Sequence, residues 1–202
     1  MKLLPLSGGG LRLLLDLDEA AMLDQLVTQL RQLLESHSST TLDPDPLFAS
    51  LEVGGSDETP EDPALARLFP DAYSGQADAS AYRSVTEQGL INRKLQDAMD
   101  VTAALGLGGG APSTSPVEVE ITPQTLPAWV RTLTALRLAI AARIGLDQSD
   151  DRERLLEDEE TRGTVLVFDW LAAILESVLA IFAAGESGAD ADDDAVDEDE
   201  DS

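Results

Sequence analysis

Cysteine is absent from this chain of 202 residues, and histidine occurs once, at His37. Without a thiol the protein forms no disulfide, binds no zinc through cysteine and uses no thiolate nucleophile or thiol redox switch. A catalytic triad would have to use His37, which lies at the predicted end of a helix, where a hydrogen-bonding or cationic side chain is favourable. We therefore interpret His37 as a structural or exposed residue and expect no catalytic site, no metal site and no cofactor.

Aromatic and basic residues are also scarce. Aromatic side chains make up 4% of the chain, so a core has to be built mainly from leucine, alanine, valine and isoleucine. Thirteen lysines and arginines face 39 aspartates and glutamates, which gives a net charge of -26. Such a surface repels phosphate backbones at long range, so we expect no direct binding to nucleic acid. The alternative interpretation of the acidity is solubility or adaptation to salt.

Two apolar segments resemble membrane-related sequences, but each contains features that argue against a membrane. Residues 1–15 are interrupted by glycines and by Arg12 and are followed by acids without a small-residue cleavage site, so we expect a cytoplasmic protein and not a secreted one. Residues 165–182 are strongly apolar, but Asp169 and Glu176 would be costly in lipid. We therefore predict a buried core helix there and no contact with a membrane.

Two parts of the chain combine a strand pattern with a helix pattern. Residues 11–15 and 117–121 place apolar residues at every second position, which is typical of half-buried strands. Each is followed by apolar residues at steps of three and four, in residues 23–34 and 126–144, which predicts a helix with one buried face.

Residues with the chemistry of helix caps lie next to both helical patterns. Asp16 or Asp18 can cap the first helix, and Thr122 followed by Pro123 suits the start of the second. Gly145 is a natural C-terminal stop for the second helix.

The two units align at a constant offset of 106 residues, so that Leu11 falls on Val117 and Leu23 falls on Trp129. This alignment predicts an internal strand–helix repeat whose two strands pair in a small sheet. Any two amphipathic helices can be slid into phase, so chance alignment is the alternative.

The other segments predict helices joined by loops. We expect a loop rich in acids and prolines at 40–63, a short helix at 63–69, a long helix at 79–105 that Gly89 kinks or splits, a flexible linker at 106–116, a loop or frayed helix at 148–160, and a final helix at 161–184.

Together these patterns predict a mainly α fold (α+β), with one helical domain over residues 9–184 and a small two-stranded sheet. The glycine runs at residues 8–10 and 108–110 lead into strands and not into helices, so we interpret them as flexible joints and not as phosphate-binding loops. We expect residues 1–8 to be a flexible N-terminus. Residues 185–202 hold ten acids and no base, and we expect them to be a disordered acidic tail.

Several short motifs occur together over about residues 9–184. They are Asp-Pro-Ala-Leu-Ala-Arg-Leu-Phe-Pro-Asp-Ala-Tyr at 62–73, Tyr82-Arg83 with Thr86-Glu87 and Lys94, Leu136-Arg137-Leu138-Ala139 with Arg143-Ile144-Gly145, and Asp169-Trp170-Leu171. As a set they resemble the actinobacterial oxidative-stress regulator family, long known only as a domain of unknown function and often encoded near the protease adaptor ClpS and cysteine-synthesis genes. None of these motifs carries catalytic chemistry.

The resemblance implies a non-enzymatic cytoplasmic regulator that acts by protein–protein interaction. The implied partner is a stress-responsive sigma factor or RNA polymerase, in the oxidative-stress response and in cysteine synthesis. The alternative is an accessory or adaptor factor for Clp-type proteolysis, which the family's gene neighbourhood suggests. An enzyme is a third class, and a buried polar pocket containing Arg83, Arg137 and Asp169 would favour it. Thiol-based sensing, proposed within the family, has no counterpart in a chain without a thiol.

A partner that suits this chain has a basic surface, as the DNA-contacting surfaces of sigma factors do. Leu47, Phe48 and Leu51 lie in the acidic loop, where exposed apolar anchors would favour binding, and the alternative is that they pack back on the domain. Arg83 and Lys94, from the motifs, complete the candidate partner-binding residues.

Other charged residues predict contacts within the protein. Arg83 with Glu87 and Arg93 with Asp97 are four residues apart and can pair on a helix surface. For four charged motif residues we favour membership of buried ion pairs in the core over contact with a partner, and these are Arg83, Arg137, Arg143 and Asp169.

The missing thiol predicts that the purified protein is insensitive to mild oxidation. Peroxide or a disulfide-forming oxidant should leave its fold and its affinity for a partner unchanged, with slow oxidation of Met22 and Met99, which we expect near the core, as the exception. Circular dichroism and affinity measured before and after treatment check this. A fast change that dithiothreitol reverses would contradict it.

Overall fold

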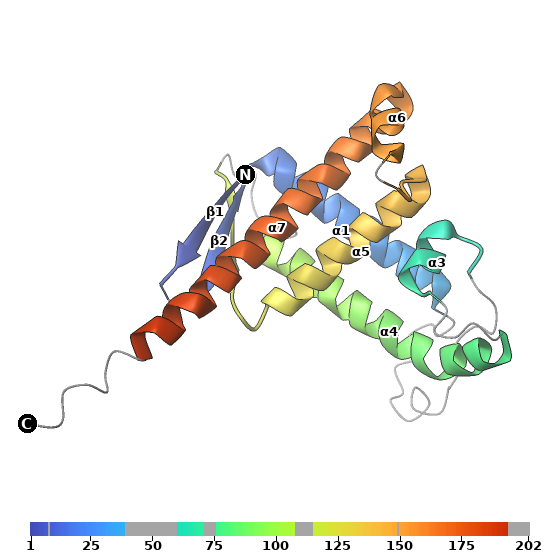
Figure 1. The fold of residues 1–202 in the computed structure, drawn as a ribbon, viewed down its shortest axis with the longest axis horizontal. Helices are drawn as coiled ribbons and strands as arrows, with labels where there is room; N and C mark the ends of the chain where they lie inside the picture. The colour runs from blue at the N-terminus through green and yellow to red at the C-terminus, as the bar shows by residue number, and fades with distance from the viewer. Residues whose placement is uncertain (8, 39–59, 71–75, 108–114, 149, 194–202) are drawn as a thin grey trace, which may run out of the picture.

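The computed structural model shows a helical domain built on one face of a small sheet (Figure 1). It describes the chain except residues 8, 39–59, 71–75, 108–114, 149 and 194–202, and it leaves out the side chains of residues 76–85 and 186–193. The described part contains six helices and three strands. The predicted mainly α class with a small sheet is therefore confirmed.

The three strands form one antiparallel sheet in the order β1-β2-β3. β1 (Lys2–Leu6) and β2 (Gly10–Leu15) form a hairpin, and β3 (Val117–Ile121) pairs with β2. The predicted pairing of the two repeat strands is confirmed. The expected flexible N-terminus and the expected number of strands are wrong, because residues 2–6 add a third strand. Pro5 obscures this strand in the sequence, but a proline is tolerated at a sheet edge.

The glycines of the hairpin are constrained by their surroundings. Gly9 has a φ of 79°, a conformation that residues with a side chain rarely adopt. A Cβ atom on Gly10 would lie 2.9 Å from the carbonyl oxygen of Ile121 in β3. Gly9 and Gly10 therefore lie in a constrained turn and strand start, and not in the flexible joint that we expected.

The two faces of the sheet have different environments. The alternate leucines of β2, Leu11, Leu13 and Leu15, are fully buried beneath the helices. On the opposite face Arg12 donates a hydrogen bond of 2.8 Å to Glu120 and lies 3.7 Å from Glu118. The period of two in the sequence therefore separates a leucine face from a charged face.

α1 (Leu17–His37) begins at a capping box. The Asp16 carboxylate accepts a hydrogen bond from the Glu19 backbone N–H, and the Glu19 carboxylate accepts one from the Asp16 N–H. The N-terminal ammonium group lies 2.9 Å from Glu19, which joins β1 to this cap. The predicted apolar stripe is buried, and the helix ends at His37 as expected.

α3 (Pro63–Leu68) and α4 (Gln76–Leu105) occupy the predicted segments with small differences in length. Asp62 caps α3 by accepting hydrogen bonds from two backbone N–H groups of its first turn. α4 begins before the predicted residue 79 and runs continuously past Gly89, which does not split it.

α5 (Leu126–Ile144) begins later than predicted. Thr122 and Thr125 close a turn instead, in which the Leu126 N–H donates to the Thr122 carbonyl oxygen at 2.8 Å. Pro127, and not Pro123, occupies the first helical turn, where a missing N–H costs nothing. The predicted stop is confirmed, because Gly145 caps the helix with a φ of 68°.

α6 (Asp151–Glu157) and α7 (Glu159–Asp193) complete the fold. α6 shows that the charged segment 148–160 is partly helical. α7 continues past the predicted end at residue 184, as far as Asp193. Residues 194–202 of the predicted tail lie outside the described residues.

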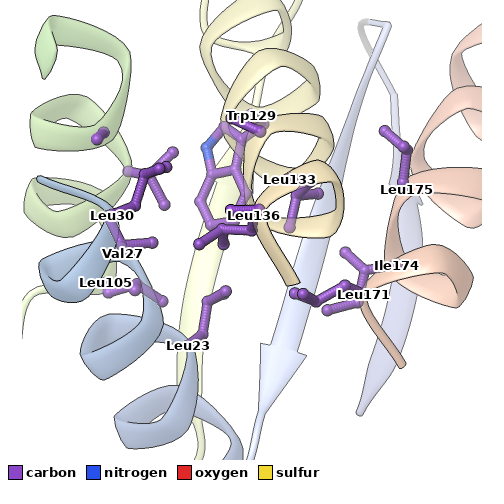
Figure 2. Close-up of a cluster of buried hydrophobic side chains, with 14 of the residues drawn as sticks. Leu23, Val27, Leu30, Leu105, Trp129, Leu133, Leu136, Leu171, Ile174 and Leu175 are labelled. Carbon is purple, nitrogen blue, oxygen red and sulfur yellow. The ribbon is translucent and has the colours of Figure 1, made fainter. Parts of the chain in front are cut away.

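The core lies where four helices meet beside the sheet (Figure 2). Trp129 of α5 is 1% exposed and extends toward α1 and α4, while Leu171 and Ile174 of α7 approach from the opposite side. Burial of each large apolar side chain contributes about 1.5–3 kcal/mol. α5 is therefore the central helix, with neighbours on both sides.

α7 differs from the buried core helix that we expected. It is the one helix in the described part of the chain that is long and apolar enough to cross a membrane, judged by length and composition alone, and 28% of that apolar window is buried. One side packs on α5 and the sheet, and the other side faces outward. In Figure 1 α7 crosses the front of the domain, and its C-terminal end projects beyond the sheet.

The two internal methionines also differ in their environments. Met22 is half-buried in α1, whereas Met99 on α4 is 48% exposed. The expectation that both lie near the core is therefore wrong for Met99. Sulfoxide at Met99 would add polarity at the surface, so the predicted insensitivity of the fold to oxidation is retained.

Truncation should separate the structural part of α7 from its acidic end. Val178 is the last buried side chain described in α7, and Ile181 and Phe182 pack partly on the core. Removing residues 185–202 should therefore leave the free energy of unfolding almost unchanged. Ending the chain after Ser177 should destabilise it by several kcal/mol, from about 1.5–3 kcal/mol for each buried large side chain lost. Urea unfolding measures both, and a large loss in the shorter deletion would contradict this assignment.

Candidate functional site

The predicted partner-binding residues fall in parts of the chain that the structure describes unequally. Leu47, Phe48 and Leu51 lie outside the described residues, so their exposure stays a prediction. Arg83 lies in α4, but its side chain is also outside the described part. Lys94 is the one predicted residue whose surroundings are described.

Lys94 lies on α4 and is half-buried next to Phe69 at the end of α3. Its Nζ atom lies 5.8 Å from the centre of the Phe69 ring, which is a cation–π distance. Burial lowers the pKa of Lys94, the charge of Arg131 lowers it further, and the charge of Asp97 opposes both. Lys94 is therefore engaged within the domain and does not extend freely from its surface.

Asp97 and Arg131 join α4 to α5. The Arg131 Nε and Nη2 atoms each donate a hydrogen bond of 2.7 Å to the carboxylate of Asp97. These hydrogen bonds raise the pKa of Arg131. Asp97 is buried, with 5% of its surface exposed, so it is not the surface partner of Arg93 that the sequence predicted. A bidentate pair fixes both the distance and the orientation of the two helices.

His37 and Glu87 join α1 to α4. Their Nε2 and Oε1 atoms are 2.7 Å apart, and the Glu87 side chain is almost fully buried. The His37 ring stacks on Phe69, with ring centres 5.9 Å apart. Next to this pair, Gln88 donates a hydrogen bond of 3.0 Å to the hydroxyl of Ser38. His37 therefore has a structural role at the end of α1.

These contacts form one polar junction between α1, α3, α4 and α5. We define the polar junction as His37, Phe69, Glu87, Lys94, Asp97 and Arg131. Each buried carboxylate in it faces a histidine or an arginine from another helix, and the Phe69 ring contacts both His37 and Lys94. Within the described residues, no three His, Asp or Glu side chains gather in a group that could hold a metal. The arrangement can fix the relative positions of the helices.

The other charged motif residues lie nearer the surface than the buried pairs that we considered. Asp169 accepts a hydrogen bond of 2.6 Å from Arg152, and Arg143 donates one of 3.2 Å to Asp62. Both pairs are partly exposed. Arg137 lies over the Phe168 ring of α7, 4.5 Å from its centre. Arg137 and Asp169 therefore make different contacts, and the side chain of Arg83, the third residue of the pocket that would favour an enzyme, lies outside the described residues.

The outward side of α7 is a surface that the sequence analysis missed. Leu166 is 58% exposed and Leu179 is 45% exposed, and Ala173 between them is also exposed. The signal was present in the sequence, because residues 165–182 are apolar on all sides of the helix. From this composition we expected a helix enclosed within the domain. α7 lies at the edge of the domain instead, which leaves one side of it uncovered.

Lys94 should make the stability of the protein depend on pH. Its folded-state pKa lies below the ordinary value of 10.5, so the unfolded chain binds more protons between those two values. Stability should therefore rise with pH across that window. Lys94→Met should remove this rise, and Lys2→Met is the matched control because Lys2 is exposed. Urea unfolding at a series of pH values tests this, and an unchanged pH dependence in Lys94→Met would contradict it.

Comparison with known proteins finds relatives along most of the chain. A family model described as a domain of unknown function, DUF2017, matches residues 1–182. A Mycobacterium leprae protein that bears the name oxidative stress regulator AosR is 30% identical over 174 residues, which cover 82% of this chain and 79% of the relative. The oxidative stress regulator AosR of Mycobacterium tuberculosis strain H37Rv is 25% identical over 178 residues, which cover 81% and 78%. No solved structure matches the chain. The chain therefore belongs to the DUF2017 family, the actinobacterial oxidative-stress regulator family that its motifs resemble.

Proposed function

We propose that this protein is a cytoplasmic, non-enzymatic regulator of the oxidative-stress response that acts by binding a protein partner. The proposed partner is a stress-responsive sigma factor or RNA polymerase, with an effect on genes of cysteine synthesis. The observation that carries the proposal is the similarity to relatives named oxidative stress regulators, which extends over 82% of the chain in one of them.

The charge of the protein supports a partner with a basic surface. A net charge of -26 attracts lysine- and arginine-rich surfaces and repels nucleic acid. Sigma factors expose such surfaces where they contact DNA, so an acidic regulator can compete with DNA for them. Electrostatic complementarity of this kind raises the rate of association and selects the partner, while apolar contacts supply most of the affinity.

The contacts of the charged residues support a role in binding over a role in catalysis. His37, the one histidine, contacts a buried carboxylate and an aromatic ring in the polar junction. The motif residues Arg143 and Asp169 form ion pairs near the surface. With no cysteine in the chain, the redox signal reaches this regulator through its partner or through its own abundance.

Affinity purification of the tagged full chain from its native cells, with and without peroxide treatment, tests the proposal. We expect mass spectrometry to find a sigma factor or polymerase subunits, enriched over a sample with an unrelated acidic protein that carries the same tag. Enrichment of a Clp ATPase without polymerase subunits would contradict the proposal and favour the adaptor alternative.

The salt dependence of binding should show how the partner is attracted. Between about 0.05 and 0.5 M salt the Debye length falls from about 14 to about 4 Å, so association with the partner should slow and affinity should fall. Removing residues 185–202, which carry ten acids, should lower the association rate more than it raises the dissociation rate. Surface plasmon resonance at several salt concentrations measures both rates. Affinity that stays flat across this range would contradict the electrostatic account.

A further inference from the structure

The outward side of α7 is an apolar surface that the fold leaves uncovered. We define the outer face of α7 by its exposed apolar residues, which are Leu166, Ala173, Leu179, Ala180 and Ala184. Leu166, at 58%, is the most exposed large hydrophobic residue in the described part of the chain. Only 28% of the apolar window of α7 is buried, although this window is apolar enough for a membrane span. Contacts within the domain therefore cover the apolar residues on one side of α7 and leave those on the other side exposed.

The outer face combines small side chains with carboxylates. Alanines along a helix allow a second helix to approach closely, because ridges of side chains then fit into shallow grooves. Glu176 lies among the apolar residues and is exposed, whereas the nearby Asp169 is already paired with Arg152. The helix then continues into the acidic segment as far as Asp193. An occupant of this face therefore has to match apolar surface and negative charge together.

We propose that the outer face of α7 is the docking surface for the protein partner, and that the partner contributes an amphipathic helix. That helix carries a stripe of leucine, isoleucine or alanine flanked by lysine and arginine. Its apolar stripe covers Leu166, Ala173 and Ala180, and its basic residues lie near Glu176. This inference rests on the proposed function, because it assigns a binding site to the protein partner of that function.

The same charges disfavour the two other occupants of an apolar helix face. A second copy of the chain would bring together two molecules that each carry a net charge of -26. A bilayer containing anionic lipids would repel Glu176 and the acidic end of α7. Insertion of α7 would also withdraw Leu171, Ile174 and Val178 from the core, where each is fully buried. A basic amphipathic helix is attracted by these negative charges, and its binding does not require α7 to leave the core.

Two substitutions of exposed leucines test the surface without disturbing the core. Leu166→Glu places a charge in the outer face, and Leu90→Glu is the matched control because Leu90 is 44% exposed on α4, away from α7. Glu176→Lys reverses the charge of the outer face, and Glu61→Lys is its control at another exposed site. Circular dichroism and melting temperature establish first that each full-length variant is folded.

The first probe is a synthetic helix of about twenty residues with a leucine–alanine stripe flanked by lysines, compared with the same peptide flanked by glutamates. Fluorescence anisotropy of labelled peptide measures affinity in low salt. We expect the lysine peptide to bind the unmodified protein at least about tenfold more tightly than the glutamate peptide. Leu166→Glu and Glu176→Lys should each weaken it by about tenfold, and Leu90→Glu and Glu61→Lys should change it little. Equal binding to Leu166→Glu and Leu90→Glu, or no binding of the lysine peptide, would overturn the proposal.

Two further measurements address the alternative occupants. In sedimentation with vesicles of phosphatidylglycerol and phosphatidylethanolamine, the protein should not bind. In analytical ultracentrifugation of the protein alone, it should be a monomer. Vesicle binding or self-association that Leu166→Glu abolishes would overturn the proposal in favour of a membrane or a second copy.

The second probe is a purified stress-responsive sigma factor, measured with the same variants by surface plasmon resonance. Absence of binding to the unmodified protein would contradict the proposed function. Binding that Leu166→Glu leaves intact would contradict only the assignment of the outer face. Binding that Leu166→Glu weakens about tenfold and Leu90→Glu retains would support both.

Discussion

The burial of one face of β2 is the interaction on which the rest of the fold depends. Leu11, Leu13 and Leu15 are fully buried, and β2 is paired with a strand on each side. α1 and α7 contact this leucine face, and its leucines share one core cluster with Trp129 of α5. Because the chain has few aromatic residues and no disulfide, close packing of leucines has to supply most of the stability. The buried pairs of the polar junction then set how α4 lies against α1 and α5.

The sequence patterns predicted the elements that depend on periodicity and capping, and they missed what depends on tertiary neighbours. The strand pairing of residues 11–15 with 117–121, the helices that follow and the stop at Gly145 are confirmed. β1 was missed because Pro5 is unfavourable in most strands and is tolerated only at an edge. The partner of Asp97 was missed because a spacing of four suggests Arg93, whereas the helix turns this carboxylate toward Arg131 on α5. The outer face of α7 was missed because composition alone does not distinguish a helix enclosed on all sides from one at the edge of a domain.

Charge and apolar surface together give this protein the features of a binding module. The described carboxylates of the polar junction bind His37 and Arg131 from other helices, so these buried charged groups stabilise the fold. The surface, by contrast, combines the net negative charge of the chain with exposed apolar residues along α7. In the function that we propose, attraction of a basic partner precedes the burial of apolar contacts. The chain has no cysteine with which to sense oxidation, so in the proposed function the oxidative signal comes from another molecule.

The central claim is that a basic protein partner covers the outer face of α7, and hydrogen–deuterium exchange tests it most directly. Exchange would be followed by mass spectrometry on the full chain, alone and in complex with the purified sigma factor. Beyond Val178 the helix buries no described side chain completely, so its amide hydrogens should exchange quickly in the free protein. The account predicts that the partner slows exchange along α7, residues 166–185 above all, and leaves β1 unchanged. Slower exchange confined to other elements, with α7 unaffected in a saturated complex, would contradict it.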